Sequence, residues 1–254
     1  MSELFDVLGV KIAVTNLQDA CQSIENWIKE RQKTYVCVAP VSTIVDCQRD
    51  SEYRKIINNA GMTTPDGMPL VWLGRLRGNK RLARTYGPDL MLKVCALSEA
   101  KGYRHFFYGG TPQTCDLLVE NLKKGFPKLD IAGALSPLFQ PGRLEERPEV
   151  LAQIDSLKPD IIWVGLGSPK QDYWMYHHRN KLNVPVMIGV GAAFDFLSGV
   201  KKQAPRWMRK SGLEWFFRLC CEPRRLWKRY LIGNAGFIYY LTRDLLFKKS
   251  FKKA

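Results

Sequence analysis

Three apolar, strand-like runs in this chain each lead into a turn of glycine and other small residues. The runs cover residues 103–108, 161–164 and 186–190, and the turns begin at Gly109, Gly165 and Gly191. In a parallel sheet the carboxyl ends of the strands lie along one edge, where ligands of α/β proteins bind. The pattern therefore predicts one ligand crevice at the ends of these strands.

Around these runs the apolar period switches between strand-like and helix-like. Asn16 is a plausible cap for a helix whose apolar face runs from Leu17 to Ile28, and residues 35–38 resemble a buried strand. Further helices are predicted at residues 88–102, 111–125 and 148–157. This alternation predicts an α/β fold, with a mostly parallel Rossmann-like sheet flanked by helices on both faces.

Positive charge is concentrated at the C-terminal end. Residues 201–254 hold fifteen Lys or Arg and three acidic residues, so they account for +12 of the total net charge of +15. The change in composition predicts a boundary near residues 199–205. We expect an α/β domain at residues 1–200 and a basic helical appendage at residues 201–254.

The appendage interleaves aromatic residues with cations at helical spacing. Such helices can lie at a lipid interface with the cations against anionic headgroups. The predicted membrane-binding residues are Trp207, Trp215, Phe216, Trp227, Lys228 and Arg229. Two alternatives stay open: the aromatics complete the core while the cations are solvated, or the segment binds nucleic acid, although no recognition module is visible.

Several other classes of protein lack support in the sequence. The first ten residues do not resemble a signal peptide, and residues 231–241 are about half as long as a membrane-spanning helix. The seven cysteines form no CxxC pair, and the adjacent His177 and His178 cannot face one metal ion. We therefore expect no metal site and no cofactor.

Asp66 is the strongest catalytic candidate. It lies in a turn stiffened by Pro65, Gly67 and Pro69, next to the apolar run 70–73, and a carboxylate in such a position can act as a general base. The alternative is that Asp66 only stabilises the turn, as aspartates in Pro-Asp-Gly sequences usually do.

The turns after the strands supply candidates for binding an anionic substrate. In the segment 165–171, Gly167 allows a tight turn, Ser168 is expected to cap a helix, and Lys170 and Gln171 would meet an anion at the helix start. Gly109 and Gly110 have the corresponding position after the earlier strand. The segment has neither the GxGxxG nor the P-loop pattern, so nucleotide-dependent oxidoreduction is a weaker alternative.

Six segments, taken in order, carry a family resemblance that covers nearly the whole chain. They resemble the WecG/TagA/CpsF family of bacterial glycosyltransferases, glycosyltransferase family 26. The segments are residues 64–69, 87–89, 108–112, 167–174, 189–195 and 204–225.

The resemblance implies transfer of a sugar from a UDP-sugar to a sugar carried on undecaprenyl diphosphate, with inversion at the anomeric carbon. It also implies a reaction without a metal ion, at the cytoplasmic face of the cell membrane. The C-terminal appendage would reach the anionic membrane surface and complete the active site. The resemblance makes nucleic acid a weaker partner, and whether the chain forms a homo-oligomer stays open.

The resemblance also assigns roles to individual residues. Asp66 matches the family's proposed general base, while Gln171 and Arg84 match positions near the substrates. Tail arginines would stabilise the departing diphosphate, and the candidates are Arg218, Arg224 and Arg225.

The chain departs from the family pattern after its first predicted strand. Many relatives have a polar Thr-x-Asn-like element there, whereas this chain has Ala39 and Val41 at the equivalent positions. We expect Ser42 or Thr43 to replace those contacts, with Thr43 as the chosen substrate-binding candidate. The change could reflect a donor sugar other than N-acetylmannosamine, for instance glucose.

Overall fold

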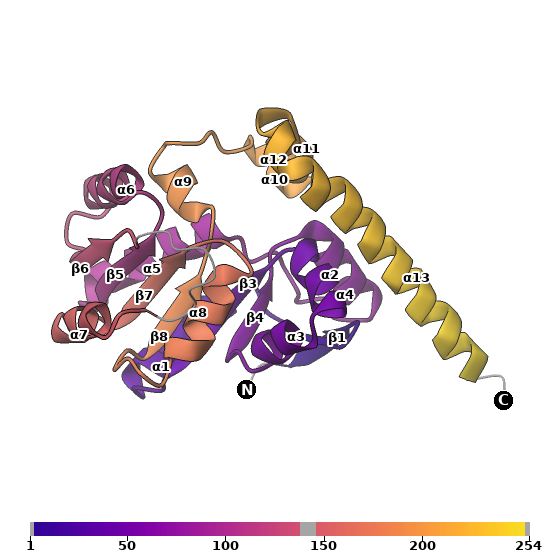
Figure 1. Cartoon of the computed structure of the whole chain (residues 1–254), viewed down its shortest axis with the longest axis horizontal. Coiled ribbons are helices and arrows are strands. Elements are labelled where there is room, and N and C mark those ends of the chain that lie inside the picture. Colours follow the sequence, from indigo (N-terminus) through magenta and orange to yellow (C-terminus); the bar gives the residue numbers. More distant parts are fainter. Residues whose placement is uncertain (1–2, 138–145, 252–254) are drawn as a thin grey trace.

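A six-stranded parallel sheet forms the centre of the molecule, as the alternating sequence pattern predicts (Figure 1). The structure is a computed structural model that describes residues 3–137 and 146–251. The strands follow the order β4-β3-β8-β7-β5-β6 across the sheet. Their bounds are β3 (Thr34–Ala39), β4 (Met62–Pro65), β5 (Arg104–Gly109), β6 (Asp130–Leu135), β7 (Ile161–Gly165) and β8 (Val186–Gly189).

Helices cover both faces of this sheet. Alternate residues of β3 point to opposite faces: Tyr35 and Cys37 pack in one core cluster, and Val36 and Val38 pack in the other. The first cluster also takes side chains from α2 (Val41–Arg49), α3 (Ser51–Asn58), α4 (Met68–Leu76), α7 (Pro148–Ser156) and α8 (Lys170–His178). The second takes side chains from α1 (Leu17–Lys29), α5 (Gly87–Lys101), α6 (Pro112–Gly125) and α9 (Ala193–Leu197).

The helix ends follow from local chemistry. The side chain of Asn16 accepts hydrogen bonds from the first-turn amides of α1, and Gly102 ends α5 in the left-handed region at φ +70°. Thr111 caps α6 in the same way as Asn16 caps α1. The predicted helices near residues 17–28, 88–102, 111–125 and 148–157 are therefore confirmed within two residues.

A small antiparallel hairpin was not predicted. It pairs β1 (Leu4–Val7) with β2 (Val10–Ala13) and forms a separate two-stranded sheet beside β4. The strands have only four residues each, so their alternation is too short to stand out in the sequence. The buried Val7 and Val10 join the core cluster that contains α2 and α3.

The chain leaves β5 and β7 in opposite directions across the sheet. β5 connects through α6 to β6 on one side, whereas β7 connects through α8 to β8 on the other. Ligands of open α/β sheets bind at such a switch point, outside the carboxyl ends of the strands. The glycine turns at Gly109 and Gly167 therefore lie where the topology favours a ligand.

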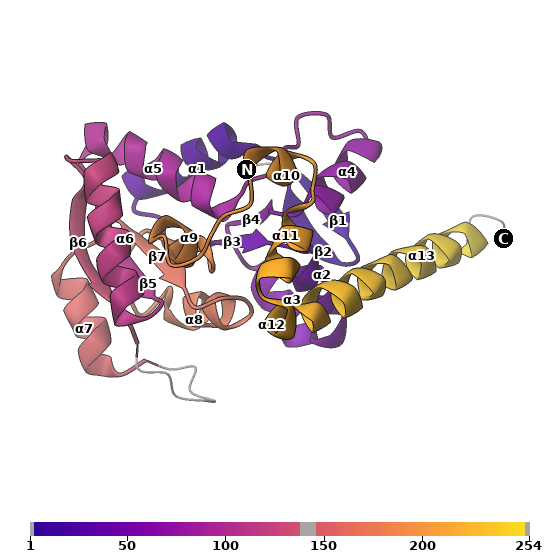
Figure 2. The same cartoon turned by 90° about the horizontal axis from the view of Figure 1, so that it is seen from above.

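The C-terminal segment crosses back to the first half of the chain. Its helices are α10 (Arg206–Lys210), α11 (Glu214–Cys221), α12 (Pro223–Trp227), a π-helical turn η1 (Lys228–Ile232) and α13 (Gly233–Phe251). α13 packs against α2 with Phe237 buried, and its far end projects from the body (Figures 1 and 2). Among residues 3–137 and 146–251, no helix combines the length and the apolar character needed to cross a bilayer. The division into two domains at residue 200 stays a prediction.

Candidate functional site

Asp66 lies directly after β4, at the carboxyl edge of the sheet. Its backbone amide donates to the carbonyl of Ala39 at 3.0 Å, which ties the turn to the end of β3. The side chain is 23% exposed and lines a cavity. The carboxylate is therefore accessible to a substrate and is neither sealed in the core nor turned away from every cavity.

Arg84 holds one oxygen of this carboxylate. Its Nη2 and Nε donate to Asp66 Oδ1 at 2.9 and 3.2 Å, and Nε also donates to the Asp66 carbonyl. The guanidinium stacks on Tyr86, with 4.2 Å between Cζ and the ring centroid. Among the described residues, no donor reaches Oδ2 of Asp66. Arg84 is thus a fixed part of the site.

Glu214 is a part of the site that the sequence analysis missed. It comes from the start of α11, and its Oε2 accepts a hydrogen bond from Arg84 Nη2 at 2.7 Å. Its other oxygen accepts from the Tyr86 hydroxyl at 2.8 Å, and the residue is only 6% exposed. One sequence signal pointed to it: Glu214 is one of three acids among the fifteen cations of the tail.

The surroundings raise the pKa of Asp66 above its usual range. Burial has the largest effect because it disfavours the charged carboxylate, and the negative charge of Glu214 acts in the same direction. Arg84 opposes both effects without cancelling them. Asp66 therefore binds a proton more tightly than a solvated aspartate, which makes it a stronger base.

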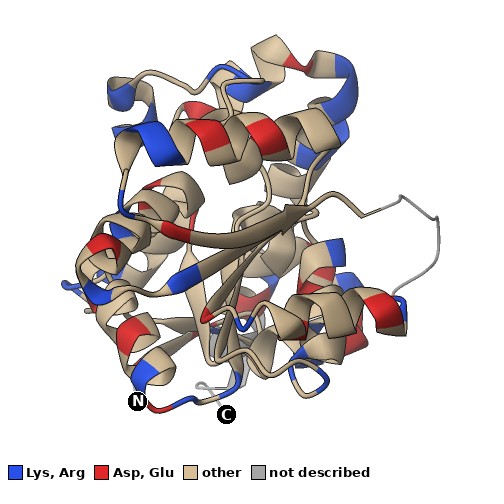
Figure 3. Cartoon of the chain, turned by 90° about the vertical axis from the view of Figure 1, so that its left-hand side faces the viewer, with Lys and Arg blue, Asp and Glu red and all other residues tan. Residues whose placement is uncertain are grey.

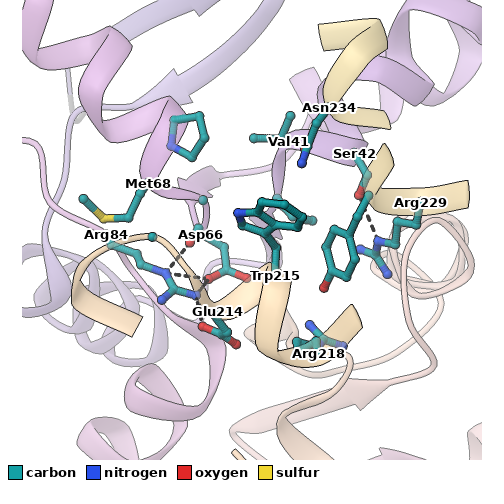
Figure 4. Close-up of a pocket in the computed structure, with 15 residues that line it drawn as sticks. Val41, Ser42, Asp66, Met68, Arg84, Glu214, Trp215, Arg218, Arg229 and Asn234 are labelled. Atoms are coloured by element: carbon teal, nitrogen blue, oxygen red, sulfur yellow. Dashed lines mark hydrogen bonds and ion pairs between the residues drawn. The ribbon is translucent and has the colours of Figure 1, made fainter. Parts of the chain in front are cut away.

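The cavity beside Asp66 is built from two distant parts of the chain (Figure 4). Its volume is about 130 Å³. One wall comes from residues 40–42, 66–69 and 84, and the tail forms the other wall. The tail residues are Gly212, Glu214, Trp215, Arg218, Arg229, Tyr230 and Asn234.

Two arginines of the tail line the cavity, but only one of them belongs to the three that were predicted to bind the substrate. Arg218 lines the cavity as expected, whereas Arg224 and Arg225 are exposed on α12 and do not line it. Arg225 pairs with Glu222 instead. Arg229, assigned to membrane binding from the sequence, lines the cavity and donates from Nε to Ser42 Oγ at 3.1 Å.

The structure favours Ser42 over Thr43 as the polar residue after β3. Ser42 lines the cavity, whereas Thr43 is buried and does not line it. Both residues lie in the first turn of α2, where a shift of one position rotates the side chain by about 100°. The structure therefore supports substrate contact by Ser42 better than substrate contact by Thr43.

The remaining predicted binding residues lie at the β5 and β7 end of the sheet. Gly109 is the last residue of β5 and Gly110 follows it, while Gly167 lies in the turn before α8, with φ +77°. Lys170 and Gln171 lie at the start of α8, where they were expected, and are its first two residues. None of these five residues lines the cavity beside Asp66.

Two expectations about the turn before α8 need correction. Ser168 does not cap the helix: α8 begins at Lys170, and no side chain caps it. Gln171 is only 2% exposed, and its Oε1 accepts from the Gly167 amide at 3.1 Å while its Nε2 donates to Ser168 Oγ at 3.4 Å. In this arrangement Gln171 shapes the turn.

Three of the four aromatic residues assigned to membrane binding are on the surface. Trp207, Phe216 and Trp227 are exposed, whereas Trp215 lines the cavity. Lys228 lies close to the Trp227 ring, at 5.6 Å from its centroid. On the face shown in Figure 3, acidic and basic segments are mixed over the helices of the α/β part. Membrane binding by the tail stays a prediction.

Within the described part of the chain, no three His, Cys, Asp or Glu side chains gather in a way that could hold a metal ion. His105 is a core residue and accepts a hydrogen bond from Trp163 at 2.8 Å. His177 and His178 are neighbours on α8.

Comparisons with known proteins agree with the geometry. The model of the glycosyl transferase WecG/TagA/CpsF family matches residues 5–251. An N-acetylglucosaminyldiphosphoundecaprenol N-acetyl-beta-D-mannosaminyltransferase of Bacillus subtilis strain 168 is 33% identical over 72% of this chain and 69% of its own length. The enzyme of the same name from Staphylococcus aureus strain MRSA252 is 26% identical over 98% of this chain and 95% of its own length.

The family match covers both walls of the cavity, from β4 to the tail helices. It favours an enzyme over the alternative of a non-catalytic nucleic-acid-binding protein. The chain belongs to the glycosyl transferase WecG/TagA/CpsF family.

Proposed function

We propose that this protein transfers a hexose or N-acetylhexosamine from a UDP-sugar to a sugar carried on undecaprenyl diphosphate, with inversion at the anomeric carbon. The observation that carries the proposal is Asp66, a carboxylate of raised pKa that lines a cavity rich in arginine. The relatives support the acceptor class, because their names describe sugar transfer to N-acetylglucosaminyldiphosphoundecaprenol. Such a reaction belongs to the assembly of cell-envelope polysaccharide or exopolysaccharide.

In the proposed mechanism, Asp66 is the general base. Arg84 occupies Oδ1, so Oδ2 is the oxygen that takes the proton from the acceptor hydroxyl. The acceptor oxygen forms a bond to the anomeric carbon while the bond from that carbon to the UDP oxygen breaks. Attack from the face opposite the leaving group inverts the configuration. The raised pKa of Asp66 suits this step because proton transfer is most effective when the pKa of the base approaches the working pH.

Fixed cations would balance the charge that grows on the departing UDP. Arg218 is the best placed candidate: it lines the cavity, and its guanidinium lies 5.3 Å from the Phe196 ring of α9, toward the centre of the sheet. We propose that the donor nucleotide extends from there to the turns at Gly109, Gly110, Gly167 and Lys170. Arg224 and Arg225 would need the tail to move before they could contact a ligand in the cavity. A reaction that uses these cations without a divalent metal or other cofactor is part of this proposal.

The protein would work at the inner, cytoplasmic face of the cell membrane, where an anionic surface attracts the basic tail. The exposed Trp207, Phe216 and Trp227 are suited to the interface, since aromatic side chains are favoured at the level of the headgroups.

The test is a donor screen with a defined acceptor. Radiolabelled UDP-glucose, UDP-N-acetylglucosamine and UDP-N-acetylmannosamine are each offered with a short-chain lipid-diphosphate-linked N-acetylglucosamine, with and without EDTA. We expect transfer from one of these donors, unchanged by EDTA, and a product with inverted configuration by NMR. Absence of transfer from every donor would reject the proposed activity, and loss of transfer in EDTA would reject the metal-free mechanism.

A further inference from the structure

Two further hollows continue from the catalytic cavity along the seam between α2 and the tail. The first shares Ser42 and Arg229 with the catalytic cavity. The second shares Arg49 and Ile232 with the first. The three hollows therefore lie next to one another along a path from Asp66 past α2 to the exposed start of α13, which Figure 1 shows beside α2. The hydrogen bond from Arg229 to Ser42 crosses the boundary between the first two.

The first hollow has the charge expected of a site for a diphosphate. Arg49, Lys228 and Arg229 line it together with one acid, Asp46, so the net charge is +2. Asp46 lies within electrostatic range of Arg229 and Arg49: burial raises its pKa, and the charges of these two arginines oppose that effect. A diphosphate that bridges a sugar and an alcohol carries one negative charge on each phosphate, and this charge matches the hollow.

The second hollow is mainly apolar. Leu231, Ile232, Ala235 and Tyr239 line it, and the first two are 54% and 46% exposed. Gly236 lies in the same wall, where α13 approaches Val45 of α2. Single exposed apolar residues are ordinary, but a connected group next to a charged hollow is typical of a binding groove.

We propose that this seam binds the acceptor lipid, with the diphosphate at Arg49, Lys228 and Arg229 and the first part of the polyprenyl chain along Leu231, Ile232 and Tyr239. The inference rests on the proposed function, because it takes its ligand class from there. The acceptor sugar then lies at Asp66 and the donor approaches from the opposite side, past Arg218. This arrangement separates the two diphosphates: Arg49, Lys228 and Arg229 contact that of the acceptor, and Arg218 contacts that of the donor.

The order of chemistry along the path favours the acceptor lipid over a bilayer as the occupant. A bilayer contact requires apolar residues on an outer surface, but it requires neither a link to the catalytic cavity nor a basic hollow between the two. The groove spans residues 231–240, a length of about 15 Å at helical rise. It therefore holds only the beginning of a long polyprenyl chain, and a short prenyl chain is enough to test it.

The experiment compares two water-soluble acceptors in the absence of any bilayer. Both carry N-acetylglucosamine diphosphate, esterified in one case to farnesol and in the other to ethanol. Calorimetry gives the Kd of each acceptor for the full-length protein. Transfer is measured in parallel with the donor that the donor screen selects. The wild type should bind the farnesyl acceptor at least tenfold more tightly than the ethyl acceptor, because burial of apolar surface adds affinity.

Substitutions in the two hollows should act differently. Ile232→Gln, and independently Tyr239→Ser, should weaken farnesyl binding about tenfold and leave ethyl binding unchanged. Arg49→Ala should weaken both acceptors about fivefold, since both carry the diphosphate. The matched controls are Leu245→Gln, farther along α13, and Lys55→Ala, an exposed cation on α3; both should bind like the wild type.

Several outcomes would overturn the inference. Equal binding of the two acceptors by the wild type, or no binding of either, removes the lipid groove. The same holds if Ile232→Gln and Tyr239→Ser change only sedimentation with anionic liposomes, because the apolar residues then contact a bilayer. If binding depends on the prenyl chain of the acceptor but no transfer occurs with any donor, the lipid groove is supported and the proposed activity is rejected.

Discussion

The carboxyl edge of the sheet has two ends that are built in different ways. At the β5 and β7 end, glycine turns and the buried Gln171 form contacts within a few residues of each other in sequence. At the β3 and β4 end, Asp66, Arg84 and Glu214 form a charged cluster, and the last two are 130 positions apart. The first end depends on backbone conformation, and the second depends on how the tail returns to the sheet.

The difference has an energetic side. Arg84 shares one guanidinium between two carboxylates, and all three side chains are less than one quarter exposed. Desolvation of charges is costly, so such a cluster is weak evidence for stability. It does strengthen the base, because both the burial and Glu214 raise the pKa of Asp66. We therefore expect substitutions at the β3 and β4 end to affect catalysis most, and those at the other end to affect the fold.

The largest effect is expected for Asp66→Asn. The amide oxygen can still accept from Arg84, so the fold should persist, but the side chain can no longer take a proton. We expect kcat/KM to fall about a thousandfold, within the range for general bases. Transfer assays and thermal unfolding measure the two effects. A variant with near-normal turnover would remove Asp66 from the mechanism.

Gly109→Ala should mainly damage the fold. Gly109 has φ +135°, and an added Cβ would lie 2.6 Å from the carbonyl carbon of Gly165. Because the obstacle is backbone of the neighbouring strand, we expect a loss of about 3 kcal/mol in the free energy of unfolding, measured with urea.

Gly125→Ala is the matched control for Gly109→Ala. Gly125 is the last residue of α6, and an added Cβ there meets nothing within 4 Å. Its stability should stay within about 0.5 kcal/mol of the wild type. Equal stability of the two variants would contradict the close approach of β5 and β7.

Glu214→Gln should make Asp66 a weaker base without displacing its side chain. Without the negative charge of Glu214, the pKa of Asp66 moves down, so the acid limb of the pH profile of kcat/KM shifts to lower pH. At neutral pH we expect kcat/KM to fall about thirtyfold, since a buried charged hydrogen bond is also lost.

The control for Glu214→Gln is Glu222→Gln, a change in the same tail. Glu222 pairs with Arg225 and Lys201 and does not contact Arg84. Its acid limb should match that of the wild type. An acid limb that stays in place in Glu214→Gln would show that Glu214 only docks the tail.

The same contrast explains what the sequence could predict. The helix from Pro112 to Gly125 follows from Thr111 and the turn before it, because a cap acts over a few residues. The contact of Glu214 with Arg84 follows from no local rule, because apolar periodicity does not encode where a distant helix docks. The choice between Ser42 and Thr43 depends on the rotation of α2 by one residue, which is finer than a sequence pattern can resolve.

The smallest effect is expected at His105, the second residue of β5, where burial lowers the pKa of the imidazole to about 3. The unfolded chain binds a proton at this histidine below about pH 6.5, whereas the folded protein does not. The contribution of His105 to the free energy of unfolding is therefore complete above pH 6.5 and is lost progressively as the pH decreases toward 3. Lowering the pH from 7.5 to 5.5 should reduce the free energy of unfolding by about 1.4 kcal/mol through this one group.

His105→Phe isolates this contribution. The variant loses the hydrogen bond from Trp163, so it should be less stable at pH 7.5 by about 1–3 kcal/mol. The gap to the wild type should narrow by about 1.4 kcal/mol at pH 5.5, because the variant has no proton to bind there. Urea unfolding at the two pH values measures this change. A gap that stays constant would mean that His105 takes up a proton in the folded protein as readily as in the unfolded chain.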